Sequence, residues 1–281
     1  GQVTRFSSQG PAGDGRIKPD LVAPGSALVS ARSSLVNSNF AANPQYTIME
    51  GSSMGAAVAG GAAGLLRQWF QEEGKVKVKG EAEGEGEEAD GPSATLLKSA
   101  LINGARREQV STDFAQGFGV LDLSNTILAL QSDSFLYADE PAGVIAGGVA
   151  EYRFTVREKG APFKATLAWT DPSVTAGTTA TLVNNLDLQV IDPKGNQYWG
   201  KAWQNSSGSQ AGSRSQPGSS QADTLNNVEQ VQISDAEPGE YLVRVWGTEI
   251  KSPVAINDGE MRAQDYAVVY GQSTAEGIVD Q

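Results

Sequence analysis

One stretch of the sequence carries residues that could form a covalent intermediate. Gly51, Ser52, Ser53, Met54 and Gly55 follow one another at the start of a Pro-free segment rich in small residues. A serine between glycines at the beginning of a helix is a plausible nucleophile, because free N–H groups and the helix dipole there suit an oxyanion. The competing interpretation is that the serine caps an ordinary Gly-rich turn. The motif alone leaves both interpretations open.

The residues that could activate Ser53 are limited by composition. The 281 residues include no His and no Cys, so the chain contains neither a histidine base nor a thiol nucleophile. Gly51, Ser53 and Gly55 match the nucleophile elbow of α/β-hydrolases, but that fold requires a histidine after the serine, and none follows here. In the subtilisin order both the Asp and the His precede the serine. A Ser–Lys dyad with Lys98 is possible in principle, although no known spacing brings Lys98 to Ser53.

The charge of the chain excludes several classes of partner. It has 33 acidic and 21 basic residues and a net charge of −12, and six of the acidic residues lie between positions 81 and 90. An acidic chain without a basic stripe argues against nucleic-acid binding and against an anionic membrane surface. No apolar run is long enough for a transmembrane helix, and no signal-peptide pattern is visible.

Three helices are expected in residues 1–132, over 53–72, 93–103 and 123–130. Small residues all round the early turns of the first helix predict its burial against a sheet. Ser93 is a plausible N-cap for the second helix, and Gly104 a plausible stop. Between these two helices, residues 74–91 have almost nothing to bury and predict a solvated, mobile acidic loop.

Residues 133–281 alternate between apolar and polar side chains. Short alternating stretches separated by Gly, Pro and Asn predict the antiparallel strands of a sandwich; they are 150–156, 163–169, 186–190, 241–245 and 266–270. The expected inner face consists of apolar side chains, namely Tyr152, Phe154, Leu167, Leu188, Val243 and Val245. No nucleophile with a base occurs in this part, which predicts a stabilising or docking module.

Three ordered motifs make residues 1–132 resemble the subtilases, the subtilisin-like serine proteases. Residues 6–11 read FSSQGP, residues 14–25 read DGRIKPDLVAPG, and residues 51–60 read GSSMGAAVAG. Residues 97–106 and 116–122 are similar to the later helix and the closing segment of that family. The second part resembles the jelly-roll or β-barrel domain that follows some subtilase catalytic domains.

The resemblance implies a fold class and an activity. The expected fold is an α/β subtilisin-like catalytic portion, with a parallel sheet and buried helices, incomplete in this chain and followed by an all-β antiparallel jelly-roll domain. The expected activity is that of a secreted serine endopeptidase, which hydrolyses polypeptides. Ser53 would be the nucleophile and its backbone N–H one oxyanion donor. The catalytic Asp and His and the oxyanion Asn would come from an N-terminal remainder of the catalytic domain.

Two further expectations concern activity and metal binding. Gly55, Ala56 and Ala57 stand where the family has Ala, then Thr or Ser, then Pro, which motivates the alternative of an inactive subtilase-like binding or scaffold module. The resemblance requires no cofactor for the chemistry, but it makes structural calcium possible. Candidate calcium ligands cluster near strand ends of the second part, although Asp and Asn also simply occupy turns; they are Asp171, Asn184, Asn185, Asp187 and Asp192.

Overall fold

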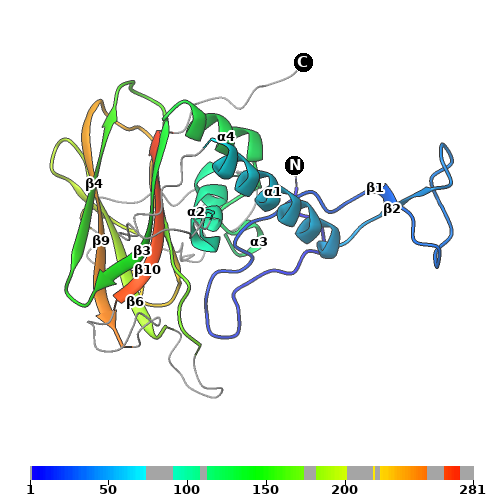
Figure 1. Ribbon diagram of the computed structural model, residues 1–281, viewed down its shortest axis with the longest axis horizontal. Helices are drawn as coiled ribbons and strands as arrows, with labels where there is room; N and C mark the ends of the chain where they lie inside the picture. The colour runs from blue at the N-terminus through cyan, green and yellow to red at the C-terminus, as the bar shows by residue number, and fades with distance from the viewer. Residues whose placement is uncertain are drawn as a thin grey trace, which may run out of the picture.

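The computed structural model describes residues 2–73, 91–107, 113–173, 182–200, 218, 222–251 and 263–272. A two-layer β-sandwich lies at one side of the molecule, and a β-hairpin extends from the other (Figure 1). The helices lie between them. Apart from Gly91, the acidic loop expected at 74–91 lies outside the described residues.

The helices confirm the sequence predictions closely. They are α1 (Ser52–Glu72), α2 (Ala94–Gly104), α3 (Asp113–Gln116) and α4 (Leu123–Gln131). Ser93 is the N-cap of α2, where its hydroxyl accepts a hydrogen bond from the Leu96 N–H. α2 ends at Gly104, as expected, although Gly104 itself is still helical. A Cβ atom there would lie 2.0 Å from Oγ1 of Thr126, so glycine allows α2 and α4 to approach each other.

Eight strands form the sandwich. One sheet has the order β3 (Phe135–Ile145), β10 (Ala263–Gln272), β5 (Phe163–Ala168), β8 (Val228–Ile233). The other has the order β4 (Val149–Val156), β9 (Gly239–Ile250), β6 (Asn184–Ile191), β7 (Gln197–Trp199). All their pairings are antiparallel. The expected inner face is confirmed, because five of its six predicted side chains belong to the buried cluster between the sheets and the sixth, Tyr152, packs against that cluster.

The first part of the chain differs from the expected parallel sheet. Its two strands, β1 (Leu28–Ala31) and β2 (Tyr46–Met49), form an antiparallel hairpin that leads into α1. Among the described residues, parallel pairing is limited to an isolated bridge between Val22 and Val120.

The early turns of α1 are exposed, whereas the sequence predicted their burial against a sheet. Ser52, Ser53, Ala56, Ala57 and Gly60 are exposed, although small residues there predicted burial. Within the described part of the chain, no sheet covers this face. The C-terminal half of α1 is anchored instead by its larger apolar side chains, and Leu66 and Phe70 are fully buried.

The helices and the sandwich share a hydrophobic core. The cluster holds residues of α1, α2 and α4 together with three residues on the sandwich sheet, Phe135, Ala267 and Val269. The sheet β3-β10-β5-β8 therefore buries both of its faces, one against the second sheet and one against the helices (Figure 1).

Both ends of α2 are held by charged side chains of that sheet. Asp139 of β3 accepts hydrogen bonds from the Ser93 N–H (2.9 Å) and the Ser93 hydroxyl (2.6 Å). Lys164 of β5 donates to the carbonyl oxygens of Ala105 (2.8 Å) and Asn103 (3.3 Å). An anion at the N-terminus and a cation at the C-terminus both complement the helix dipole.

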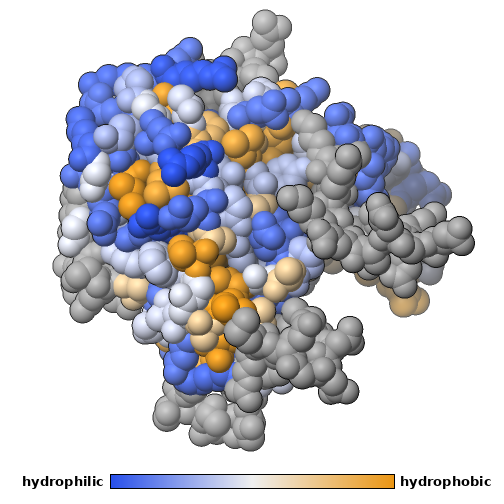
Figure 2. All heavy atoms as spheres, turned by 60° about the vertical axis from the view of Figure 1, so that its left-hand side comes forward, coloured by the Kyte–Doolittle hydropathy of each residue, from blue (hydrophilic) through white to orange (hydrophobic). Residues whose placement is uncertain are grey.

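The exterior of the sandwich is largely polar. Figure 2 shows a mostly hydrophilic surface interrupted by separate apolar groups. None of the helices among the described residues is long and apolar enough to cross a membrane.

Candidate active site

Ser53 occupies the first turn of α1 and is exposed to solvent. The N-cap of the helix is Gly51, which makes no side-chain capping bond, so Ser53 is not the capping residue. The first backbone bonds of the helix run from the N–H groups of Met54 and Gly55 to the Gly51 carbonyl. The N–H groups of Ser52 and Ser53 precede these bonds and have no acceptor within the helix. They offer hydrogen-bond donors to an anion at this position.

The start of α1 is fixed by the segment that ends at Gly25. The Gly51 N–H donates to the Gly25 carbonyl at 2.8 Å. A Cβ atom on Gly25 would lie 2.9 Å from the Gly51 carbonyl oxygen, so only glycine allows this approach. A Cβ atom on Gly55 would lie 3.2 Å from the Ala23 carbonyl oxygen, a tight contact. Gly51 itself has φ = 151°, which disfavours other residues.

Residues 118–121 form a third segment, which hydrogen-bonds to residues 20–22. The Val22 N–H donates to the Gly119 carbonyl at 3.0 Å, and the Leu121 N–H donates to the Val22 carbonyl at 2.8 Å. The Phe118 N–H donates to the Asp20 carbonyl at 2.9 Å. Residues 51–55 and residues 118–121, far apart along the chain, therefore both pack against residues 20–25.

A cavity of about 580 Å³ lies beside the start of α1. Its walls come from most of residues 2–8, most of residues 19–26 and the first turns of α1, which contribute Gly55, Ala56 and Ala59. Ser52 also lines it, next to Ser53 in the chain. The nucleophile candidate therefore sits at the border of a recess.

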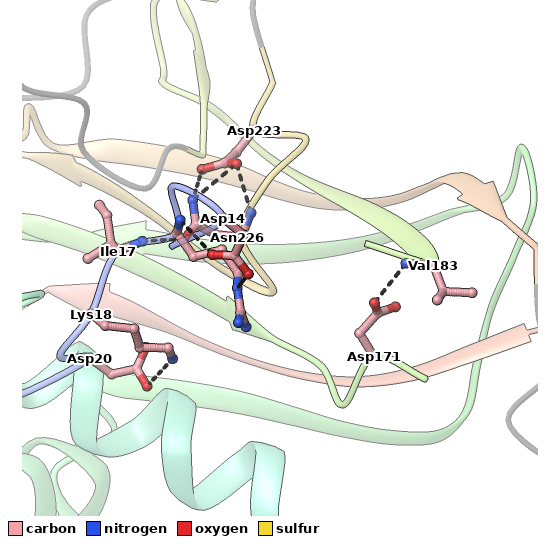
Figure 3. Close-up of polar contacts among 9 residues, drawn as sticks. Asp14, Ile17, Lys18, Asp20, Asp171, Val183, Asp223 and Asn226 are labelled. Carbon is pink, nitrogen blue, oxygen red and sulfur yellow. Dashed lines mark hydrogen bonds and ion pairs between the residues drawn. The ribbon is translucent and has the colours of Figure 1, made fainter. Parts of the chain in front are cut away.

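Residues 14–20 are attached to the sandwich by a buried hydrogen bond. Figure 3 shows the Ile17 N–H donating to Oδ1 of Asn226, at 2.9 Å. Asp223 orients that amide by accepting from Nδ2 of Asn226 at 3.0 Å. Ile17 also belongs to an apolar cluster with Val228 and Phe118.

Comparison with known proteins identifies the first part of the chain. Residues 1–119 match the family described as Subtilase family, or peptidase S8. This part of the chain belongs to the subtilase family. Within the matched segment, residues 20–25 contact both the start of α1 and residues 118–119.

The similar proteins are serine proteases of much greater length. In Dictyostelium discoideum, the serine protease/ABC transporter B family protein tagA is 36% identical over 88% of this chain, and tagB is 30% identical over 87%. The chain spans only 14% and 15% of those two proteins. The C5a peptidase of Streptococcus pyogenes is 36% identical over 72 residues, which are 26% of this chain and 5% of that protein.

A solved structure was also matched. The serine protease of Aeromonas sobria covers 84% of this chain with 46% of its own length, at 12% identity and a TM-score of 0.26. That score is too low to bear on the fold.

Lys98, the base considered for a Ser–Lys dyad, pairs with another group of the subtilase segment. Its ammonium lies 3.4 Å from Oδ2 of Asp20. The ammonium of Lys18 lies 2.7 Å from the same oxygen atom, and Figure 3 shows this second pair. Burial lowers the pKa of Lys98, and the Asp20 carboxylate opposes that shift. Lys98 therefore helps to hold the segment 18–20 against α2.

The candidate calcium ligands have different local roles. Asp171 accepts from the N–H groups of Val183 and Asn184 at 2.8 Å, and Figure 3 shows the first of these bonds. Asp192 accepts from the N–H groups of Lys194 and Asn196 in a turn. Of the five candidates, Asn185 and Asp187 lie side by side on β6, where the Asn185 amide donates to Asp187 at 3.4 Å.

Several positioning residues escaped the sequence analysis. Lys164 lies on the face of β5 that alternation alone would expose, yet it is only 7% exposed. Its role depends on the helices that cover that face. Asn226 and Glu229 contact Ile17 and Leu188, and nothing local in the sequence indicated these partners.

Proposed function

We propose that this chain supplies the nucleophile of a subtilisin-type serine endopeptidase. The supporting observation is the exposure of Ser53 at the first turn of α1, within the subtilase segment. The Ser53 oxygen would attack the scissile carbonyl of a polypeptide while a histidine takes its proton. The Ser53 N–H and the helix dipole would stabilise the oxyanion that forms.

The proposal requires groups from outside these 281 residues, because the chain has no histidine. The catalytic Asp, the His and a second oxyanion donor would come from an N-terminal remainder of the catalytic domain. We propose that this remainder covers the small-residue face of α1 and fills the apolar cavity beside it. Its strands would complete the parallel sheet expected of a subtilisin-like domain. We also propose an extracellular location for the whole protein.

The proposal has an alternative in an inactive subtilase-like binding module. It is motivated by Gly55, Ala56 and Ala57, which differ from the residues that the family has at these positions. The tight contact between Gly55 and the Ala23 carbonyl gives the first departure a packing reason and weakens that alternative.

Labelling with a fluorophosphonate tests the activity directly. Because such probes react with serines that are activated by a neighbouring base, we expect a single label on Ser53 in the protein that carries these residues with the remainder of its catalytic domain. Mass spectrometry of the digested protein locates the label. A folded protein that stays unlabelled at Ser53 would favour the inactive module.

Replacement of Gly25 by Val should impair the same site without removing a reacting group. The added side chain would collide with the Gly51 carbonyl and push the start of α1 away. Since a misplacement of about 1 Å can cost roughly 10²-fold, we expect kcat/KM on a peptide substrate to fall by about that factor. Gly13→Val is the matched control, because nothing lies within 4 Å of its added Cβ atom. Equal activity of the two variants would contradict the proposed role of Gly25.

A further inference from the structure

The hairpin formed by β1 and β2 projects from the rest of the molecule (Figure 1). Its two strands are paired in antiparallel register, with Val29 opposite Ile48 and Ala31 opposite Tyr46. In such a ladder, hydrogen-bonded pairs alternate with pairs whose backbone groups point away from the partner strand. The hydrogen bonds of the hairpin therefore show which outer edge is occupied.

The loop that joins the two strands occupies the outer edge of β2. The Ile48 N–H donates to Oδ1 of Asn39 at 2.7 Å, and Nδ2 of Asn39 donates to the Ile48 carbonyl at 3.0 Å. The Tyr46 N–H donates to the Asn43 carbonyl at 3.1 Å, and the Ser38 hydroxyl donates to the Tyr46 carbonyl at 2.6 Å. The N–H groups of Ile48 and Tyr46 are thus directed into the loop and away from β1.

The register determines the direction of the backbone groups on β1. Because Ile48 and Tyr46 belong to the non-hydrogen-bonded pairs of the ladder, the residues opposite them also turn their N–H and C=O groups away from the partner strand. These residues are Val29 and Ala31. Neither forms a backbone hydrogen bond within the part of the chain that the structure describes. The outer edge of β1 is therefore open, whereas that of β2 is closed.

The open edge of β1 lacks the features that usually protect an edge strand. Such edges are commonly blunted by charged residues, proline or bulges, because a free edge pairs readily with another chain. Residues 28–31 read LVSA, and their register with β2 is unbroken. Val29 is 49% exposed, and Tyr46, on the same face of the hairpin, is 42% exposed. The edge is therefore both unpaired and flanked by apolar side chains.

We propose that an extended segment of the N-terminal remainder pairs with the open edge of β1 and adds a third strand to the hairpin. Binding by strand addition uses main-chain hydrogen bonds, which Val29 and Ala31 offer here. Side chains of the added strand would pack beside Val29 and extend the apolar face of the hairpin. This inference rests on the proposed function, which requires such a remainder.

The position of the hairpin favours the remainder as the occupant. Gln2 lines the same cavity as Gly25 and Ser26, which lie just before β1. Residues that precede Gln2 in the whole protein would therefore begin within reach of the open edge. The Gly51 N–H donates to the Gly25 carbonyl at the base of the hairpin, so this edge also adjoins the start of α1 that the remainder is proposed to cover. A two-stranded hairpin is marginally stable by itself, and a third strand would stabilise it.

Hydrogen exchange of the hairpin amides tests the proposal. In the 281-residue chain, the Val29 and Ala31 amides should exchange nearly as fast as in an unstructured peptide, while the Ser30 amide, which faces β2, should exchange more slowly. In the protein that carries the remainder, we expect the exchange of Val29 and Ala31 to slow by at least about a hundredfold, because a paired amide must open before it exchanges. Mass spectrometry with fragmentation to single residues measures these rates.

Ala31→Pro blocks the open edge and leaves the pairing of β1 with β2 intact. Proline removes an N–H that points away from β2, a position at which edge strands tolerate it. In the protein with the remainder, this variant should return the Val29 amide to fast exchange, while the Ser30 amide stays protected. Ser34→Pro is the matched control, because Ser34 is exposed and holds the second position of the turn closed by the Val36 N–H, where proline is favoured. It should leave the Val29 amide protected.

The exchange rates do not depend on peptidase activity, so they separate this inference from the proposed function. Equal exchange of the Val29 and Ala31 amides with and without the remainder would overturn the third strand. Protection that grows with the concentration of the 281-residue chain would assign the edge to a second copy, and protection that requires an added polypeptide would assign it to substrate. Either result would also overturn the proposal. The wild-type comparison decides the matter even if Ala31→Pro fails to fold.

Discussion

Peptide hydrolysis is expected to fall by about 10⁶-fold when Ser53 is replaced by Ala, the scale of the loss when the subtilisin nucleophile is removed. The change deletes the attacking oxygen and leaves α1 intact, because Ser53 is exposed and alanine is a good helix former. The measurement is kcat/KM on a peptide substrate in the protein that contains the remainder of the catalytic domain.

Ser52→Ala is the matched control for that experiment. Ser52 is the neighbouring residue in the same turn, is also exposed, and lines the adjacent cavity. We expect this variant to keep most of its activity and its fluorophosphonate labelling. If Ser53→Ala retained normal turnover, or if Ser52→Ala lost it, the nucleophile would be assigned wrongly.

The second large effect concerns Lys164 and the stability of the chain at alkaline pH. Burial lowers the pKa of Lys164 from 10.5 to about 8, with a smaller contribution from Arg107. Between about pH 8 and 10.5 the folded chain holds a neutral amine while the unfolded chain still binds the proton. Since the unfolded state then binds more protons, the free energy of unfolding should rise with pH in this window.

The comparison with Lys164→Met isolates this effect. Below about pH 8, Lys164 is charged in both the folded and the unfolded wild type. The full cost of burying that charge then lowers the free energy of unfolding. From pH 7 to pH 10.5 the wild type should gain about 3 kcal/mol relative to the variant, from 1.36 kcal/mol per pKa unit. Urea unfolding at a series of pH values measures this difference in the free energy of unfolding. The neutral amine can still donate to the carbonyl oxygens of Asn103 and Ala105, so the contact with α2 persists.

Lys194→Met serves as the control for the pH series, because the Lys194 side chain is 66% exposed. It shows what the loss of one exposed lysine contributes over the same window. A constant difference between wild type and Lys164→Met would mean that Lys164 titrates as it does in the unfolded chain, contrary to the effect of its burial.

The burial of Lys164 also shows that the helices of the first part of the chain cover one face of the sandwich. Sequence alternation predicted a separate sandwich core, and that core exists between the two sheets. The outer face of β3 and β10 contributes Phe135, Ala267 and Val269 to a second core with the helices. Asn226 adds a buried bond to the segment that precedes Gly25. The strand alternation could not reveal these contacts, because it indicates which side chains share a face but not what covers that face.

The sequence by itself determined the local features of this protein. The glycines around Ser53, the apolar spacing of the helices and the period-two strands are encoded within short windows, because local sterics and periodicity act over a few residues. The lack of histidine also determined, from composition alone, that a histidine base for the proposed nucleophile Ser53 would have to come from outside these residues.

Only the tertiary structure decided which polar residues are buried and what they touch. Lys164 reaches carbonyl groups about 60 positions away, and Glu229 reaches the Leu188 N–H across 41 positions. The exposed small-residue face of α1 was equally inaccessible to prediction, because small residues suit burial whether or not a covering element is present. Burial, and with it the pKa and the partners of each polar group, depends on contacts between segments that are distant in the chain.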